Sequence, residues 1–362
     1  MQEYKVKRAY VPGHISIIIP CYHAGKYMER IYENLRNQTF PDFEAILIND
    51  GDKNQVEQMS NIASKDERIK VVWKENGGAS SARNLGISMA QSEWLVFIDA
   101  DDSIKPTYLE SLFNSVKGTD AEMGIGGYTT INTKSGRQVA YPIKIDNSAN
   151  KVCNFGEAYE YIQNYGFSSY PWNKIYKTSL IHELNLFMDE DIGVIHDAVF
   201  ICNLFKVIKK VSLIPDSGYI YYREDEGSLV SCYDKNLERD RRLVLSLRDE
   251  INHMVGWPEA RCLSFQRNYL SALAIMIITN LFKNKSPLSF GEKVKRIKNE
   301  IYYKTDIINA LKTTSIRSIN GKITKFLVLH SSAFIVVLYY SVISWLRLHF
   351  KGIYAVVKPW IN

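Results

Sequence analysis

Three carboxylates fall within four residues at Asp99, Asp101 and Asp102, directly after the apolar run Trp94–Ile98. Negative charges this close disfavour one another's ionisation unless a cation compensates them. Mg²⁺ and Mn²⁺ take oxygen ligands and often use one or two carboxylates together with substrate phosphates. The alternative is a solvated turn whose aspartates cap the next helix. Following a buried strand, the cluster predicts a divalent metal site.

Two other polar segments could contact a ligand. Asp50 ends the apolar run Phe43–Asn49, where it could accept a hydrogen bond from a nucleobase or serve only as an Asx-turn residue. Gly77 and Gly78 open a helix, and a helix N-terminus with close backbone approach favours anions. Ordinary capping by Ser80 is the alternative. The segment is neither a Walker loop nor a G-x-G-x-x-G fingerprint, so ATP and NAD are not indicated.

The first third of the chain alternates strand-like and helix-like segments. Short apolar runs predict strands over 15–19, 43–49, 69–73 and 94–98, and helical periodicity predicts helices over 26–37, 55–64 and 78–90. Such alternation is typical of a mainly parallel sheet with helices on both faces. Ligands then bind beyond the carboxyl ends of the strands, and residues 21–23, 50–52 and 99–102 all lie at such ends.

Composition narrows the class of protein. The chain has 362 residues, of which 46% are hydrophobic and 23% charged, so a disordered or collagen-like chain is excluded. From Asp234 onward there are 21 Lys or Arg and 9 Asp or Glu, a net +12 that leaves −6 for the first 233 residues. The five cysteines form no CxxC pair, and no signal peptide is expected, which fits a reducing compartment.

The motifs together resemble glycosyltransferase family 2. The resemblance is carried by IPCYHAGKYMERIYENLRNQTF, ILINDGD, ENGGASSARNLGI and FIDADDSIKP in this order, over Ile15–Gly127, and continues weakly to Ser231. It implies a GT-A fold, an α/β architecture with a mainly parallel mixed sheet flanked by helices, here with a helical C-terminal extension. It also implies a nucleoside-diphosphate sugar donor, a divalent metal and inversion at the anomeric carbon.

The resemblance also implies roles for individual residues. Those expected to bind the donor are Pro20, Tyr22, Asp50, Gly77, Arg83, Asp99 and Asp101, with Asp101 and Asp102 expected to hold the metal. Pro20 and Tyr22 would line the nucleotide pocket, and Arg83 would lie near the base or diphosphate. His23, where the family usually has Asn, and Asp52, where Ser is common, depart from the pattern and leave the donor class open.

A general base should deprotonate the acceptor hydroxyl, and two acidic clusters compete for this role. They are residues 189–191 and His196-Asp197. Family members often carry Glu-Asp, two residues and Phe, which His196–Phe200 matches if His196 replaces the Glu, so we assign Asp197 as the base. Asp197 could instead cap the helix that follows. Possible acceptor or phosphate contacts are Trp172, Lys174, His196 and Arg223, which could equally be core or rim residues.

The C-terminal part is basic and then apolar. Phe326–Leu346 comprises 21 residues without Lys, Arg, Asp or Glu, and is flanked by Lys and Arg on both sides. Its serines and its aromatic residues, which suit a membrane interface, favour in-plane association with anionic lipid over a single transmembrane span. A buried helix of the folded domain is a third possibility. We expect an N-terminal tail (1–13), a GT-A domain (14–231), a basic helical region (232–322) and a membrane-associating C-terminus (323–362).

These observations predict an inverting, non-processive, metal-dependent hexosyltransferase. It would transfer one sugar from a donor that we expect to be UDP-linked to a hydroxyl of a lipid-linked oligosaccharide. The reaction would serve surface-polysaccharide synthesis and take place at the cytoplasmic face of the cell membrane. A Q-x-x-R-W signature of processive enzymes does not follow Asp197. Basic charge without base-stacking or groove-reading motifs argues against a nucleic-acid partner. The alternatives are a nucleotidyltransferase and a non-catalytic, membrane-associated sugar-binding module.

Overall fold

The computed structural model describes residues 9–145, 150–163, 167–223, 232–283 and 286–349. The chain divides into two units, residues 1–225 and 226–362, and each is described by itself. The domain boundary predicted at residue 231 stays a prediction, because 224–231 lie outside the described residues.

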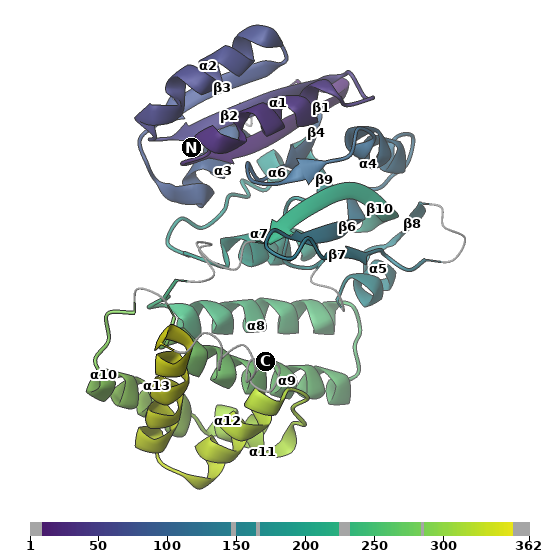
Figure 1. Ribbon diagram of the computed structural model, residues 1–362. Helices are drawn as coiled ribbons and strands as arrows, with labels where there is room; N and C mark the ends of the chain where they lie inside the picture. The colour runs from purple at the N-terminus through teal and green to yellow at the C-terminus, as the bar shows by residue number, and fades with distance from the viewer. Residues whose placement is uncertain (1–8, 146–149, 164–166, 224–231, 284–285, 350–362) are drawn as a thin grey trace, which may run out of the picture. The chain divides into compact units, whose positions relative to one another are not determined.

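The first unit is built on one mixed sheet with the strand order β3-β2-β1-β4-β9-β6-β10-β5 (Figure 1). β1–β4 are mutually parallel, β9 runs antiparallel to both β4 and β6, and β10 is parallel to β6. β7 and β8 pair with β6 and β10. The strands are Val11–Cys21, Phe43–Asp50, Ile69–Lys74, Ser92–Phe97, Ser103–Ile104, Met123–Asn132, Gln138–Tyr141, Lys151–Asn154, Lys174–Lys177 and Lys210–Arg223, numbered β1 to β10 in this order.

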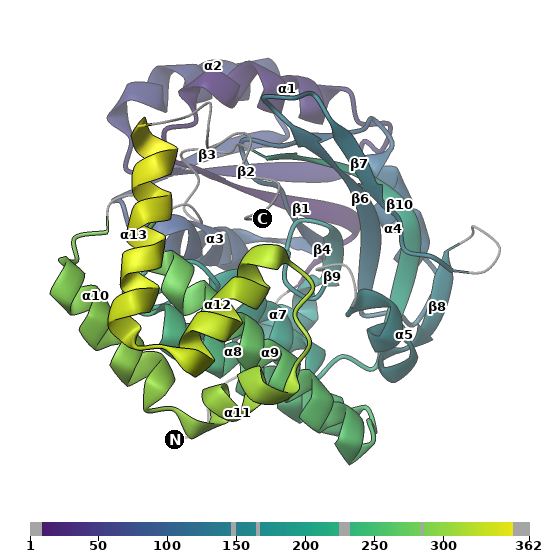
Figure 2. The same cartoon turned by 60° about the horizontal axis from the view of Figure 1, so that its bottom comes forward.

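Helices cover both faces of the parallel part of this sheet. Figure 2 shows α1 and α2 on one side of β1–β3 and α3 on the other. The helices of the first unit are Met28–Arg36, Val56–Lys65, Gly78–Met89, Tyr108–Val116, Phe155–Ile162, Thr178–Glu183 and His196–Phe205, numbered α1 to α7. Because both faces are covered, Ile15, Ile17, Ile18 and Ile19 are all buried, which explains the unbroken apolar run of β1. The predicted α/β GT-A architecture with a helical C-terminal region is confirmed.

Element boundaries differ from the predicted ones by a few residues. β1 begins at Val11, inside the predicted N-terminal tail, because Val11 pairs with Ser92 of β4 before the register shifts ahead of Ile15. β4 begins at Ser92, two residues earlier than predicted. Pairing with a neighbouring strand, which local sequence does not reveal, accounts for the longer β1.

The second unit is helical and has its own apolar core. Its helices are Leu237–Met254, Glu259–Asn280, Phe290–Ile297, Thr305–Thr313, Ile319–His330 and Ala333–His349, numbered α8 to α13, with a π-helical turn at Lys298–Tyr302. Leu273, Ile277, Ile301, Leu311 and Val336 are among the core side chains that pack together. The predicted uncharged stretch is divided between α12 and α13 by Ser331 and Ser332. Among the described residues, no helix is long and apolar enough to cross a membrane.

Candidate active site

Asp50 organises the loop that precedes α3. Its Oδ1 accepts hydrogen bonds from Lys74 Nζ (2.8 Å) and the Gly77 amide (2.9 Å), and its Oδ2 accepts from the Gly78 amide (2.8 Å). Lys74 is the register partner of Asp50 on β3. The carboxylate predicted to bind a base therefore also holds the glycine pair at the N-terminus of α3. Lys74 was not anticipated, because its contact depends on strand pairing.

Gly51 lets this loop approach β2 closely. Its φ is +84°, and a Cβ built there would lie 2.6 Å from the Asn76 backbone nitrogen. Asn76 also donates to the Asp50 carbonyl at 2.9 Å. Both the left-handed backbone and the contact require glycine at this position.

The two departures from the family pattern contact each other. His23 Nδ1 lies 3.1 Å from Asp52 Oδ2, and His23 occupies the left-handed region at φ +51°. The Tyr22 ring lies 4.0 Å from the His23 ring and is 53% exposed. Pro20 lies two residues earlier in β1. The changes at positions 23 and 52 therefore form one local unit beside the predicted nucleotide pocket.

Arg83 of α3 joins the two halves of the predicted site. Its Nη2 donates to Asp99 Oδ1 at 2.6 Å, and its Nη1 donates to Asp197 Oδ1 at 3.1 Å. Asp99 follows β4 and Asp197 lies in the first turn of α7. One buried guanidinium thus brings together the predicted donor-binding aspartate and the predicted base, which are 98 residues apart in sequence.

The charged groups at this junction shift one another's pKa values. Burial acts to lower the pKa of Arg83, but Asp197 and Asp99 outweigh it and raise the pKa. Burial acts to raise the pKa of Asp197, but the charge of Arg83 outweighs it and lowers the pKa. Asp197 is therefore an ionised carboxylate at neutral pH, the form that a general base requires.

His196 lies at the same junction. Its Nδ1 donates to the Gly193 carbonyl at 2.8 Å, which leaves Nε2 2.9 Å from Arg83 Nη1 and 3.1 Å from Asp197 Oδ1. A neutral ring in this tautomer accepts a hydrogen bond from Arg83. His196 thereby helps to orient Arg83. Because its ring is buried and contacts Arg83, this role fits His196 better than the predicted contact with an acceptor or a phosphate.

The competing acidic cluster has different partners. Asn84, next to Arg83 on α3, donates to Glu190 Oε1 at 3.0 Å and exchanges hydrogen bonds with the Met188 backbone. These contacts tie the loop before α7 to α3. Of the two candidate base clusters, the structure brings Asp197 into contact with the Arg83–Asp99 pair and gives Glu190 a bond to Asn84.

Asp102 is buried and hydrogen-bonded to β10. Its Oδ2 accepts from the Tyr219 hydroxyl (2.7 Å) and its Oδ1 from the Tyr222 amide (2.9 Å). Burial, with the charges of Asp99 and Asp101, raises the pKa of Asp102 well above its ordinary value. In this arrangement Asp102 anchors β10 to the end of β4, and its predicted metal contact would compete with both bonds. Tyr219 was not anticipated from the sequence.

Asp101 is the exposed carboxylate of the cluster. The Arg30 guanidinium of α1 donates to the Asp101 carbonyl and lies 4.8 Å from the centre of the Tyr222 ring. Asp99 and Asp101 also contribute to the raised pKa of Asp102, which marks a local excess of negative charge. An all-oxygen donor set in such a place fits Mg²⁺ or Mn²⁺. Arg30 was missed because its helix is separated from this loop by three strands in sequence.

Trp172 and Lys174 lie in the interior. The Trp172 ring is 2% exposed and stacks on Tyr219 at 4.3 Å and on Tyr170 at 4.8 Å. Buried Lys174 donates to the Tyr170 carbonyl and to Asn173 Oδ1 (2.7 Å). Burial lowers the pKa of Lys174 well below its ordinary value, against the charge of Asp197. Arg223, at the exposed end of β10, is the member of the predicted acceptor set that faces solvent.

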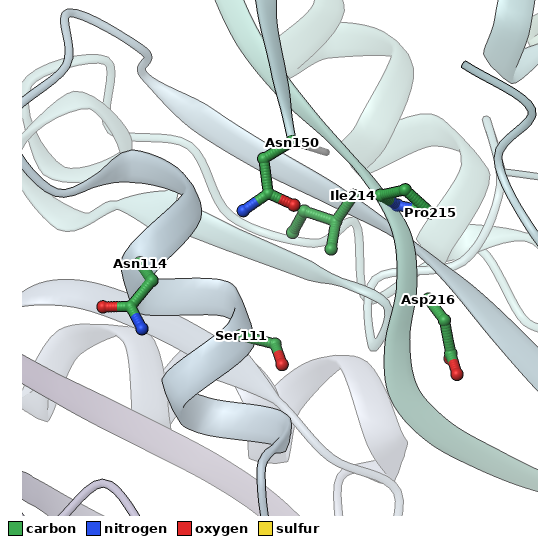
Figure 3. A pocket seen from close by; sticks show the side chains of 6 residues that line it. All are labelled: Ser111, Asn114, Asn150, Ile214, Pro215 and Asp216. Atoms are coloured by element: carbon green, nitrogen blue, oxygen red, sulfur yellow. The ribbon is translucent and has the colours of Figure 1, made fainter. Parts of the chain in front are cut away.

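A separate hollow of about 420 Å³ lies between α4 and β10 (Figure 3). Its lining residues are Ser111, Asn114, Asn150, Ile214, Pro215 and Asp216. None of the predicted donor, metal or base residues lines it, so the strand-end cluster and not this hollow is the candidate active site.

Comparisons with known proteins find glycosyltransferases. The profile of glycosyl transferase family 2 matches residues 16–183. The chain is 32% identical over 220 residues to the uncharacterized glycosyltransferase EpsJ of Bacillus subtilis, covering 59% of this chain and 62% of that relative. It is 28% identical over 232 residues to the glycosyltransferase GlyG of Streptococcus pneumoniae, covering 62% and 76%.

The same fold is found in a solved structure. Residues 1–349 of S. aureus TarS, crystallised with UDP-GlcNAc, superpose with a TM-score of 0.63 at 19% identity, covering 91% of each chain. This likeness extends beyond the family profile into the helical unit. The profile match places residues 16–183 in glycosyltransferase family 2, and the fold shared with TarS extends beyond these residues.

Proposed function

We propose that the protein transfers one sugar from a UDP-linked donor to an acceptor hydroxyl, with inversion at the anomeric carbon. The observation that carries this proposal is the Arg83 junction, where the donor-side Asp99 and the base Asp197 bind one guanidinium. The solved TarS chain, which binds UDP-GlcNAc and has the same fold, supports a UDP-sugar donor. The relatives EpsJ and GlyG, which are named as glycosyltransferases, support sugar transfer, and we propose surface-polysaccharide synthesis as the process that this reaction serves.

The proposed reaction is a direct displacement. Asp197 takes the proton of the acceptor hydroxyl as its oxygen bonds to the anomeric carbon, while the bond from that carbon to the diphosphate oxygen breaks. Since Arg83 lowers the pKa of Asp197, the base is weak and ionised, so proton transfer is expected to accompany bond formation rather than precede it. A divalent cation held by Asp101 would offset charge on the departing diphosphate.

Donor hydrolysis tests the proposal. With Mg²⁺ or Mn²⁺, we expect the purified protein to release UDP from at least one member of a panel of nucleotide sugars, and we expect EDTA and Asp101→Ala each to abolish the release. Pyrophosphate release from a nucleoside triphosphate and a sugar phosphate would instead indicate a nucleotidyltransferase. Sugar binding without turnover of any donor would indicate a non-catalytic module, and either result would overturn the proposal.

We further infer that α12 and α13 lie in the plane of an anionic membrane, where a lipid-linked oligosaccharide would be the acceptor. Phe326 of α12 is 61% exposed and Trp345 of α13 is 51% exposed, and Leu338 lies exposed between them in sequence. Lys322 and Lys325 precede Phe326 on α12. Exposed apolar and aromatic side chains beside cations suit the interface of an anionic bilayer.

Vesicle flotation measures this association. A triple variant, Phe326→Ser, Leu338→Ser and Trp345→Ser, is expected to bind anionic vesicles at least about tenfold more weakly, since each buried side chain of this size contributes more than 1 kcal/mol. Tyr303→Ser, which removes a 70% exposed aromatic of the same unit, is the control and should bind normally. Unchanged binding of the triple variant would contradict the inference, and resistance to salt and alkaline extraction would favour a span.

A further inference from the structure

The turn between α8 and α9 brings three potential metal ligands together in the second unit. Asp249 and His253 lie one turn apart near the end of α8, and Cys262 lies in the first turns of α9. One ligand atom from each of the three lies within 4.8 Å of the other two. Gly256, at φ +77°, closes the turn with the Trp257 amide bonded to the Asn252 carbonyl at 2.9 Å. The connection is therefore short and internally hydrogen-bonded.

Each of these side chains has an atom available for a cation. Asp249 Oδ1 is buried and accepts no hydrogen bond. His253 Nδ1 donates to the Asp249 carbonyl at 2.8 Å, as the second nitrogen of metal-bound histidines commonly does, which leaves Nε2 as the lone-pair nitrogen. The buried Cys262 Sγ has a long 3.8 Å contact with the Trp257 carbonyl. A buried oxygen without a donor is costly, and a bound cation would satisfy it.

A further carboxylate, that of Glu259, lies beside His253 and outside the group of three. Glu259 Oε2 is 3.3 Å from His253 Nε2. Neither of these atoms carries a proton when the histidine is neutral, so they repel unless the ring is protonated or a cation lies between them. Two carboxylates, those of Asp249 and Glu259, thus flank one histidine, at 3.9 and 3.3 Å from its ring nitrogens, which leaves an excess of negative charge unless a cation binds.

We propose that Asp249, His253 and Cys262 hold a zinc ion in the second unit, with Glu259, which faces His253, as the nearest candidate for a fourth ligand. Zn²⁺ takes mixed sulfur, nitrogen and oxygen ligands in tetrahedral geometry, whereas Mg²⁺ and Ca²⁺ prefer oxygen alone. Ligand atoms in a tetrahedral zinc site lie about 3.5 Å from one another. The ligand atoms of Asp249, His253 and Cys262 lie within 4.8 Å of one another, so small side-chain rotations would bring them to that spacing. Binding would tie the end of α8 to the start of α9. The inference does not depend on the proposed sugar transfer.

Titration of the metal-free full-length protein with Zn²⁺ and with Co²⁺ tests the site, in millimolar Mg²⁺ to saturate the catalytic carboxylates. We expect one equivalent of Zn²⁺ to bind, and Co²⁺ to give the near-ultraviolet charge-transfer absorption of a thiolate ligand. Cys262→Ala should remove that absorption, and His253→Gln, at a half-exposed position that folding tolerates, should weaken Zn²⁺ binding at least about tenfold.

Matched controls lie in the same unit. Cys232→Ala and His330→Gln should bind zinc as the unsubstituted protein does. The proposal is overturned if no Zn²⁺ binds, which would leave His253 as an imidazolium paired with Glu259. It is equally overturned if Cys262→Ala retains the thiolate absorption, or if Asp101→Ala alone removes the zinc, because the metal would then belong to the catalytic site.

Discussion

Replacing Asp197 by Asn is expected to reduce the rate of sugar transfer by about 10²- to 10⁴-fold, the usual contribution of a general base. The amide keeps the shape of the side chain and an oxygen that can accept from Arg83, so the fold and donor binding should persist. What is lost is the ability to take the proton of the acceptor hydroxyl. Steady-state kinetics with a turned-over donor should show the loss in kcat, with the KM for the donor nearly unchanged.

Glu190→Gln is the matched control for the competing acidic cluster. Its amide oxygen still accepts the hydrogen bond from Asn84, and Glu190 does not contact Arg83 in the described structure, so activity should stay within about twofold. If Glu190→Gln were inactive while Asp197→Asn retained most of the activity, the base would belong to residues 189–191, and the assignment of Asp197 would be wrong.

Arg83→Leu is expected to lower the free energy of unfolding by about 3–5 kcal/mol, because it leaves two mostly buried carboxylates without their common cation. Urea denaturation at pH 7 measures this loss. Lys105→Met, which removes an exposed ion pair with Asp216, should change stability by less than about 1 kcal/mol. Equal effects of the two substitutions would contradict a special role for Arg83.

The pH dependence of the Arg83 variant provides a second readout. In the unsubstituted protein the pKa of Asp197 is lowered, so the stabilisation is present above the unfolded value near 3.9 and is lost as the pH falls through the folded pKa. Without Arg83, burial should raise the pKa of Asp197, and the variant should lose stability as the pH rises from the unfolded value to the raised folded pKa. The stability difference between the two proteins should therefore grow over that range, and a constant difference would show that Arg83 does not set this pKa.

The strand segments of the first third of the chain and the polar clusters at their ends could be predicted from local sequence. Apolar runs such as Ile15–Ile19 are typical of strands buried on both faces, and Asp50 and Asp99 follow two of them. The convergence of these clusters follows from parallel pairing, because parallel strands end at the same edge of a sheet. The register that places Lys74 opposite Asp50 could not be predicted, since it depends on pairing between β2 and β3.

The C-terminal stretch likewise combines a feature that is visible in the sequence with one that depends on tertiary packing. Its lack of charge over Phe326–Leu346 was visible in the sequence, but two uncharged serines gave no clear sign that the helix would break between α12 and α13. Ser331 adopts an extended conformation there, at φ −138°. Packing of Val328 and Val336 into the core of the second unit selects two helices, a tertiary effect that residue composition does not contain.

The residue types available for catalysis can be read from the sequence: three clustered aspartates, a glycine pair before a helix and a carboxylate in a second region of the chain. How these residues are used depends on the folded arrangement. It directs Arg83 to both Asp99 and Asp197, and it buries Asp102 against Tyr219. The physical reason is that a charged side chain removed from water must find its partners in space, and those partners come from strands and helices that are distant in sequence.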